Sequence, residues 1–398
     1  MTPDKTRRVL TLSTLWPNAA NPRFGTFVAQ SVEALQAGSH WQPTVINPIG
    51  LPPLTVGPYK ALSAAAVDGK ERGIEIYRPT FRLLPKFGGR FNPGQIVRAA
   101  LPLARRLHAQ QPFDLVDAQF FYPDGPAAMR IAQELGLPFS AKARGADIHY
   151  WGARSYGRKA LLETADKAAG VLAVCEALAD DMTALGMERG KITVHYTGLD
   201  RDRFRPLGHT MLRQRIAGEL GVPIGENDEL VVTVGALIAR KGQELVIRAL
   251  AGLPAAQLLL VGQGEDDASL RKLSKDSGVA DRVHFLGSVD HDLLPPILSA
   301  ADVMVLPSTS EGLANAWIEA LACGTPIVIT DAGGAREVVT GPEAGVIVAR
   351  TVRALREGIR LVIDRKYSPQ VVAASVDGFS WEANGAALAD YYDRLLAT

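Results

Sequence analysis

Short apolar runs rich in β-branched residues alternate with helical patterns along the whole chain. The first such unit is RVLTLSTL (8–15), followed by GTFVAQSVEALQAG (25–38) and QPTVINPI (42–49). Strands that alternate with helices predict βαβ units and a parallel sheet. Because the alternation restarts after residue 205 with ELVVTVGAL (229–237), we expect two doubly wound α/β domains.

The length of 398 residues also favours two domains over one. TGLDRDRFRPLGHT (197–210) is rich in charge, glycine and proline, as interdomain connections are, and places the boundary near Pro206. We therefore predict an N-terminal domain over 1–205 and a C-terminal domain over 206–378. Residues 379–398 have apolar side chains at helical spacing and predict a final helix.

The composition excludes several classes of protein. With 47% hydrophobic and 21% charged residues the chain is neither disordered nor of low complexity. Its two cysteines, Cys175 and Cys323, support neither a disulfide framework nor a metal site, which fits a reducing cytoplasm. The apolar run near the start ends at Pro17, so it reads as a first strand rather than a signal peptide.

The segment PSTSEGLANAWIEALACG (307–324) reads as a loop that leads into a helix. Free amides near Gly312, Leu313 and Ala314 would suit a phosphate at the positive end of that helix. Glu311 stands beside the glycine, and Glu319 lies eight residues further on among apolar side chains. From these residues alone, either both carboxylates grip a ligand or they serve the helix dipole and a solvated face.

A second loop, VGALIARKG (234–242), carries Arg240 and Lys241 between two glycines. Two cations at a strand-to-helix loop suit a diphosphate, although a basic surface turn has the same appearance. Gly25, in the loop after the first strand, would let the backbone approach a ligand. No G-x-G-x-x-G stands at that first turn, which argues against a nicotinamide-dependent dehydrogenase.

Taken together, these segments resemble the retaining glycosyltransferases of family 4. The strongest element is the P-S-x-x-E-G block with its later E-A, G-T-P-I-V and Gly-Gly loop. VGALIARKG, RVHFLGSV (282–289), TGLDRDRFRP (197–206) and FSWE (379–382) support it, so the resemblance covers most of the chain. It implies the GT-B arrangement, in which two Rossmann-like domains face a cleft and the C-terminal helix crosses back to the N-terminal domain.

The resemblance also implies roles for single residues. Glu311 would hold the donor sugar's hydroxyls, Glu319 the ribose diol, and Lys241 with Arg240 the diphosphate. Backbone groups near Val289 would read the base. Ala236 stands where the family often has an arginine, so Arg240 is expected to compensate.

In the N-terminal domain, DAQFFYPDG (117–125) and RGADIHYW (144–151) are similar to family segments that lie near the substrates. Arg144 would contact donor phosphates or an anionic acceptor, and Asp147 would fix its loop. Tyr122 and Asp124 would line the acceptor side. A purely structural pair of Arg144 with Asp147 is the alternative.

The implied reaction is the metal-independent transfer of a hexosyl unit, with retention, from a UDP- or GDP-linked sugar. The acceptor would be a saccharide or a polyprenyl-diphosphate-linked intermediate of surface polysaccharide synthesis, and no cofactor is implied. Two alternatives stay open: a non-hydrolysing sugar-nucleotide epimerase of the same fold, and a non-enzymatic two-domain sugar-binding protein.

Residues 78–106 form a basic stretch without acidic residues, interleaved with phenylalanines. Such a stretch either lies on an anionic membrane surface, as a peripheral protein on the inner face of the plasma membrane would, or is a solvated face. Pro102 is expected to interrupt a helix there. Nucleic acid is a poor partner, because the net charge is only +1 and no recognition motif accompanies the stretch.

Overall fold

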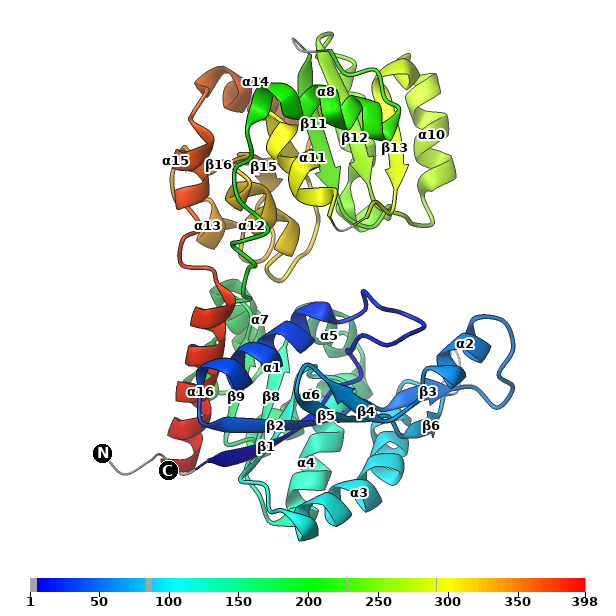
Figure 1. The fold of residues 1–398 in the computed structure, drawn as a ribbon, viewed down its shortest axis with the longest axis vertical. Coiled ribbons are helices and arrows are strands. Elements are labelled where there is room, and N and C mark those ends of the chain that lie inside the picture. Colours follow the sequence, from blue (N-terminus) through cyan, green and yellow to red (C-terminus); the bar gives the residue numbers. More distant parts are fainter. Residues whose placement is uncertain (1–5, 84–87, 226–227, 291, 398) are drawn as a thin grey trace. The chain divides into compact units, whose positions relative to one another are not determined.

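The computed structural model describes residues 6–83, 88–225, 228–290 and 292–397, and it divides into two compact units (Figure 1). Unit 1 comprises Met1–Gly198 together with Trp381–Thr398, and unit 2 comprises Leu199–Ser380. The chain enters unit 2 at Leu199, a few residues before Pro206. The buried side chains of Leu199 and Phe204 show that this connection is packed.

Unit 1 is built on an eight-stranded sheet whose order departs from the order of the strands in the chain. All of its strand pairs are parallel except the antiparallel pair of β4 with β5. A separate parallel pair joins β3 (Ile49–Leu51) and β6 (Thr80–Arg82). In spatial order the sheet strands are β10 (Ile192–Val194), β9 (Gly170–Ala173), β8 (Phe139–Ala143), β7 (Leu115–Ala118), β1 (Arg7–Leu12), β2 (Trp41–Ile46), β5 (Ile74–Tyr77) and β4 (Gly69–Glu71).

The helices of unit 1 connect these strands and pack on the sheet. The third helix continues through Pro102, so the predicted interruption is wrong. Pro102 is exposed, and the carbonyl group that its ring frees, at exposed Arg98, can therefore turn to water. The helices are α1 (Thr26–Gly38), α2 (Pro58–Ala64), α3 (Asn92–Gln110), α4 (Asp124–Leu135), α5 (Ala146–Gly152), α6 (Ser155–Lys167), α7 (Glu176–Leu185), η1 (Arg189–Lys191) and α16 (Trp381–Ala397).

Unit 2 holds a six-stranded, fully parallel sheet, which confirms the prediction of a second doubly wound sheet. Strands β14 and β15 are buried along their whole length, as expected of strands covered on both faces. In spatial order the strands are β13 (Val283–Gly287), β12 (Ala256–Val261), β11 (Glu229–Val234), β14 (Val303–Leu306), β15 (Ile327–Thr330) and β16 (Gly345–Val348).

Helices also connect the strands of unit 2, and the apolar core of this unit lies between the sheet and several of them. Side chains of the fourteenth helix, capped by the Thr351 hydroxyl at its start, contribute to this core. The helices are α8 (His209–Leu220), η2 (Ala239–Lys241), α9 (Gln243–Leu250), α10 (Asp267–Asp276), η3 (Ala280–Arg282), α11 (Leu294–Ala300), α12 (Asn315–Ala322), α13 (Ala335–Val338), α14 (Val352–Arg365) and α15 (Pro369–Ala374).

The C-terminal helix α16 belongs to unit 1, which confirms the predicted return of the chain. Figure 1 shows it in red beside the blue helix α1. Leu388 and Tyr392 join the unit 1 core, where the Tyr392 ring meets the Trp41 ring edge-on at 5.2 Å. The buried Asn384 side chain accepts a 2.6 Å hydrogen bond from Ser31. The last helix is therefore part of the N-terminal core.

Gly385 sets how closely α16 approaches α1, because a Cβ there would lie 2.5 Å from the backbone carbonyl carbon of Ala34. We expect Gly385→Ala to destabilise unit 1 by about 1–3 kcal/mol through overpacking. Gly218→Ala in α8 is the matched control, because its Cβ would meet open space and should stabilise by ~0.5–1 kcal/mol. Urea unfolding measures both, and equal effects of the two changes would contradict the close contact.

Among the helices that the structure describes, none has both the length and the apolar character needed to cross a membrane.

Candidate functional site

Three adjacent strands of unit 2, β11, β14 and β15, end at loops that bring the predicted donor residues together. The Lys241 Nζ atom lies 2.6 Å from Glu311 Oε1, and a guanidinium nitrogen of Arg240 lies 3.3 Å from the same oxygen. Only 8% of the Glu311 side chain is exposed, against 13% for Lys241. Two cations and one carboxylate thus meet at the carboxyl edge of a parallel sheet, where such sheets bind ligands.

Glycines allow the loop after β11 and the loop after β14 to pack closely against each other. Gly242 has a φ of 74°. A Cβ there would lie 2.6 Å from the Pro307 carbonyl oxygen. Gly235, at the end of β11, has a φ of 151°, and Lys241 passes across its bare Cα. The Thr309 amide donates to the Arg240 carbonyl oxygen at 2.9 Å, which ties the second loop to the first.

The loop after β15 completes this arrangement. Gly333 has a φ of 52°. A Cβ on it would lie 2.3 Å from the Gly312 carbonyl oxygen. The Gly334 amide donates to that same oxygen at 2.8 Å. Helix α12 begins only at Asn315, so Gly312, Leu313 and Ala314 form the approach to the helix rather than its first turn. The predicted phosphate-binding amides therefore lie on a loop held from three strand ends.

Arg350, which follows β16, was not predicted as a site residue. Its Nε donates to the Pro307 carbonyl oxygen at 2.9 Å, and its Nη2 donates to the Ala239 carbonyl oxygen at 3.3 Å. One guanidinium thus bridges the loop after β14 and the loop after β11. No local pattern marks it, because its partners lie 43 and 111 residues away in the chain.

Glu319 sits in α12 among the buried residues Trp317, Ile318 and Ala320. Burial raises the pKa of its carboxyl group to about 7, and the positive charge of Arg203 opposes that rise. Val289 follows β13, two strands away from β11, and is half-buried. The structure thus brings Glu311, Lys241 and Arg240 into contact, while Glu319 and Val289 stand on separate elements of the same unit.

In unit 1, Arg144 follows β8 and reaches the segment after β7. Its guanidinium donates to the Gln119 carbonyl oxygen at 3.0 Å and to the Gln119 side-chain oxygen at 2.7 Å. It also lies 4.8 Å from the centre of the Phe27 ring. Burial lowers the pKa of Arg144 to about 10. The arginine therefore braces the β7 loop.

Asp147 is fully buried and accepts hydrogen bonds from three backbone amides, those of Arg144, Phe121 and Ile148, at 2.8–3.1 Å. Its hydrogen bond with Arg144 thus runs through the backbone amide and not through the guanidinium. Burial raises the pKa of this carboxyl group. Tyr122 is also buried, and its hydroxyl donates to the Gly89 carbonyl oxygen at 2.8 Å.

Asp124 fixes the loop that follows β1. It accepts a 2.7 Å hydrogen bond from the Thr14 amide and a 3.2 Å bond from the Thr14 hydroxyl. Burial raises the pKa of its carboxyl group to about 7. Gly25, with a φ of 71°, stands against the same loop, where a Cβ would lie 2.5 Å from the Leu15 carbonyl carbon. Both residues thus shape the loop after β1.

A pocket of about 440 Å³ opens at these loops, and the sequence analysis did not find it. Thr14 lines it after β1, and Asn47 lines it after the neighbouring strand β2. Asn47 is 1% exposed, and its Oδ1 has no hydrogen-bond partner within the described part of the chain. Amides and aromatic rings make up much of the remaining lining: Asn18, Asn21, Asn92, Phe24 and Phe81.

Two family models match the chain. The model "Glycosyltransferase Family 4" matches residues 25–203, and the model "Glycosyl transferases group 1" matches residues 221–375. TuaC of Bacillus subtilis, which is named as a teichuronic acid biosynthesis glycosyltransferase, is 26% identical over 92% of this chain and 91% of its own length. A GDP-mannose-dependent phosphatidylinositol monomannoside mannosyltransferase of Mycobacterium tuberculosis is 35% identical, over 49% of this chain and about half (54%) of its own.

Solved structures share the fold over nearly the whole chain. Sucrose-phosphate synthase of Thermosynechococcus elongatus superposes with a TM-score of 0.78 at 21% identity, covering 98% of this chain and 100% of that one. The Anabaena protein HepE, solved in complex with UDP, gives a TM-score of 0.73 at 20% identity with the same coverage. At these identities the likeness shows the GT-B fold.

Proposed function

The chain belongs to glycosyltransferase family 4, and we propose that it transfers a hexosyl unit from a nucleotide-diphosphate sugar to a hydroxyl group with retention of configuration. The observation that carries this proposal is the contact of Lys241 and Arg240 with Glu311 on glycine-bounded loops of unit 2. Cations beside bare backbone suit a diphosphate, and the carboxylate suits sugar hydroxyls.

In this proposal, unit 2 holds the donor. Lys241 and Arg240 stabilise the negative charge that grows on the departing nucleoside diphosphate, and amides of the loop that includes Gly312 contribute further. Glu311 grips hydroxyls of the transferred sugar, and Glu319 grips the ribose diol. Without a donor, Lys241 and Glu311 satisfy each other, which keeps two nearly buried charges paired until the substrate arrives.

The acceptor hydroxyl would attack the anomeric carbon on the face from which the diphosphate leaves, so no side-chain nucleophile is required. We assign the sugar of the acceptor to the amide-lined pocket of unit 1. The amide side chain of Asn21, which lines the pocket, would hydrogen-bond to a hydroxyl group, and the exposed ring of Phe24 offers an apolar face to a sugar ring. Asp124 and Asp147 would then act by holding the loops of this pocket.

The relatives suggest a setting for the reaction. TuaC is named for teichuronic acid biosynthesis, and the mycobacterial enzyme for GDP-mannose, while HepE was solved with UDP. We therefore propose a UDP- or GDP-linked donor and a role in the synthesis of a surface polysaccharide, on the cytoplasmic face of the membrane.

Calorimetric titration with UDP, GDP, ADP and dTDP in the presence of a chelator tests the proposal. We expect one diphosphate to bind selectively and without metal, and its hexose conjugate to yield a product with the donor's anomeric configuration by NMR. Free sugar-nucleotide epimer as the product would identify an epimerase instead. Absence of binding by all four nucleotides would overturn the donor site.

A further inference from the structure

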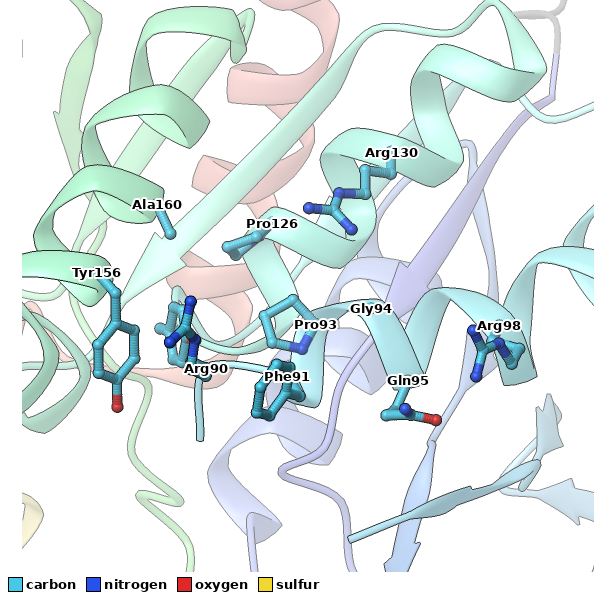
Figure 2. A pocket seen from close by; sticks show the side chains of 11 residues that line it. Arg90, Phe91, Pro93, Gly94, Gln95, Arg98, Pro126, Arg130, Tyr156 and Ala160 are labelled. Atoms are coloured by element: carbon cyan, nitrogen blue, oxygen red, sulfur yellow. The ribbon is translucent and has the colours of Figure 1, made fainter. Parts of the chain in front are cut away.

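A second pocket of unit 1, which we call the arginine pocket, has a different chemistry. It has a volume of about 540 Å³ and lies beside the start of α3 (Figure 2). Arg90, Arg98 and Arg130 line it, together with Phe91 and Tyr156. Figure 2 shows Arg90 near Tyr156 at one end and Arg98 at the other, with Arg130 of α4 reaching toward Pro93.

The three arginines contrast with others on the same unit. On α3 and α4, Arg105 pairs with Glu134, and in the segment before α3 the buried Arg78 pairs with Glu71. No carboxylate among the described residues lies within ion-pair distance of Arg90, Arg98 or Arg130. Lys86 and Phe87, which the sequence analysis placed in the same basic stretch, lie outside the described residues. The basic stretch is thus partly neutralised, and unpaired charge remains at the pocket.

Backbone geometry brings two of these arginines to one place. A Cβ on Gly94 would lie 3.8 Å from Arg130 Nη1, so the α4 arginine reaches over the first turn of α3. Arg98 is four residues after Gly94 and therefore lies on the same face of α3, one turn away. Like charges that line one pocket repel each other. A bound anion would relieve that repulsion and would also meet the positive start of a 19-residue helix.

The pocket adjoins the amide-lined pocket through consecutive residues. Asn92 lines the amide-lined pocket, and the next residue, Pro93, lines the arginine pocket. Likewise, Pro123 lines the amide-lined pocket and Tyr122 the arginine pocket. Two partly exposed aromatic residues line the same pocket as the arginines: Phe91, which is 52% exposed, and Tyr156, which is 37% exposed. The Arg90 guanidinium lies 5.2 Å from the Phe91 ring centre. A ligand that occupies both pockets would combine hydroxyl groups with an anionic group.

We propose that the arginine pocket binds a phosphate ester group carried by the acceptor substrate. That the ligand is the acceptor rests on the proposed function, whereas the recognition of phosphate rests on the pocket alone. Guanidinium groups match the oxygens of phosphate in bidentate geometry, and three of them balance the charge of a mono- or diphosphate ester. The phosphate would come either from a soluble phosphosugar or from the headgroup of a lipid.

Calorimetry with inorganic pyrophosphate tests the pocket, with the donor site first saturated by the nucleoside diphosphate that binds it. We expect the Arg98→Gln/Arg130→Gln double variant to bind pyrophosphate roughly a hundredfold more weakly, about tenfold for each charged hydrogen-bonding partner lost. Arg105→Gln is the matched control on the same helix and should bind within about twofold of the wild type. Unchanged nucleotide binding in the double variant shows that unit 2 is intact.

Vesicles of phosphatidylcholine, with and without phosphatidylglycerol, distinguish the two sources. Sedimentation with the anionic vesicles that is lost in the double variant but kept in the Arg105 control supports a lipid headgroup. Pyrophosphate binding without vesicle binding supports a soluble phosphate ester. If the double variant equals the wild type with both probes, the inference is overturned, even if the donor site stands. If no nucleotide binds while pyrophosphate does, the proposed function fails and the phosphate pocket remains.

Discussion

Replacing Lys241 with methionine is expected to lower kcat by about 10²- to 10³-fold, the usual loss when one stabiliser of a developing anion is removed. Methionine keeps the length of the side chain and removes only the charge. Lys241 passes across Gly235 and touches Glu311 at 2.6 Å, so it stands where the diphosphate would gather charge. Initial rates with the donor identified by calorimetry measure the effect.

The substitution also removes the closest partner of the Glu311 carboxylate and leaves it only the more exposed Arg240 at 3.3 Å, which weakens the pairing of a nearly buried charge and destabilises the fold. The double variant Lys241→Met/Glu311→Gln removes that charge. If its melting temperature recovers, the instability of the single variant came from the Glu311 charge, and the low kcat of the single variant measured below its melting temperature reports the loss of the lysine. Lys272→Met, which breaks an exposed ion pair with Asp276, serves as the control for lost charge. Normal turnover by the Lys241 variant would place the diphosphate elsewhere.

Much of the fold could be predicted because strand and helix signals are local. The alternation of segments such as RVLTLSTL with helical patterns predicted both parallel sheets, and the spacing of Leu388 and Tyr392 predicted the last helix. Where that helix packs depends on Asn384 and Gly385 meeting α1, some 350 residues earlier in the chain. Spacing alone holds no information about such a partner.

The candidate site likewise contains residues that local sequence patterns predicted and residues that they did not. Lys241 and Glu311 were marked by glycines and by their place after strands, and these marks are local. Arg350 and Asn47 had no such marks, because each gains its place from loops brought together by the sheet. Arg98 and Arg130 were two charges in different segments until the packing of α3 on α4 placed them in the lining of one pocket.

Asp124 and Asp147 illustrate how residues marked by a motif can be occupied by hydrogen bonds within the fold. The sequence analysis predicted that Asp124 lines the acceptor side and that Asp147 fixes the loop of Arg144. Each carboxylate is fully buried and accepts from backbone amides or from Thr14. We therefore expect Asp124→Asn to alter acceptor KM through the position of Thr14. A motif marks a place in the fold, whereas hydrogen bonds decide what a residue contacts there.

The affinity of unit 2 for nucleosides is expected to rise with pH through neutrality. Burial raises the pKa of Glu319 to about 7, so this carboxyl group is largely protonated in slightly acid solution. A ribose diol donates two hydrogen bonds and therefore prefers the ionised carboxylate, which only accepts. Below its pKa the carboxyl group must lose its proton before it can bind the diol. The affinity for the nucleoside therefore falls by roughly tenfold for each pH unit well below the pKa.

Titration with the free nucleoside of the preferred donor, from about pH 6 to about pH 8, measures this rise without interference from ionising phosphates. Glu319→Gln cannot ionise and should bind the nucleoside weakly and equally across the range.

The stability of the fold is expected to change with pH in the opposite direction to the affinity. A carboxyl group whose folded pKa lies above its unfolded value stabilises the fold only while protonated, so its contribution is lost as pH rises toward 7. The Gln variant should therefore be more stable than the wild type at alkaline pH and bind the nucleoside less well. Equal affinity of the wild type and Glu319→Gln at about pH 8 would remove Glu319 from the ribose site, because an ionised carboxylate that grips the diol must bind it better than the neutral amide does.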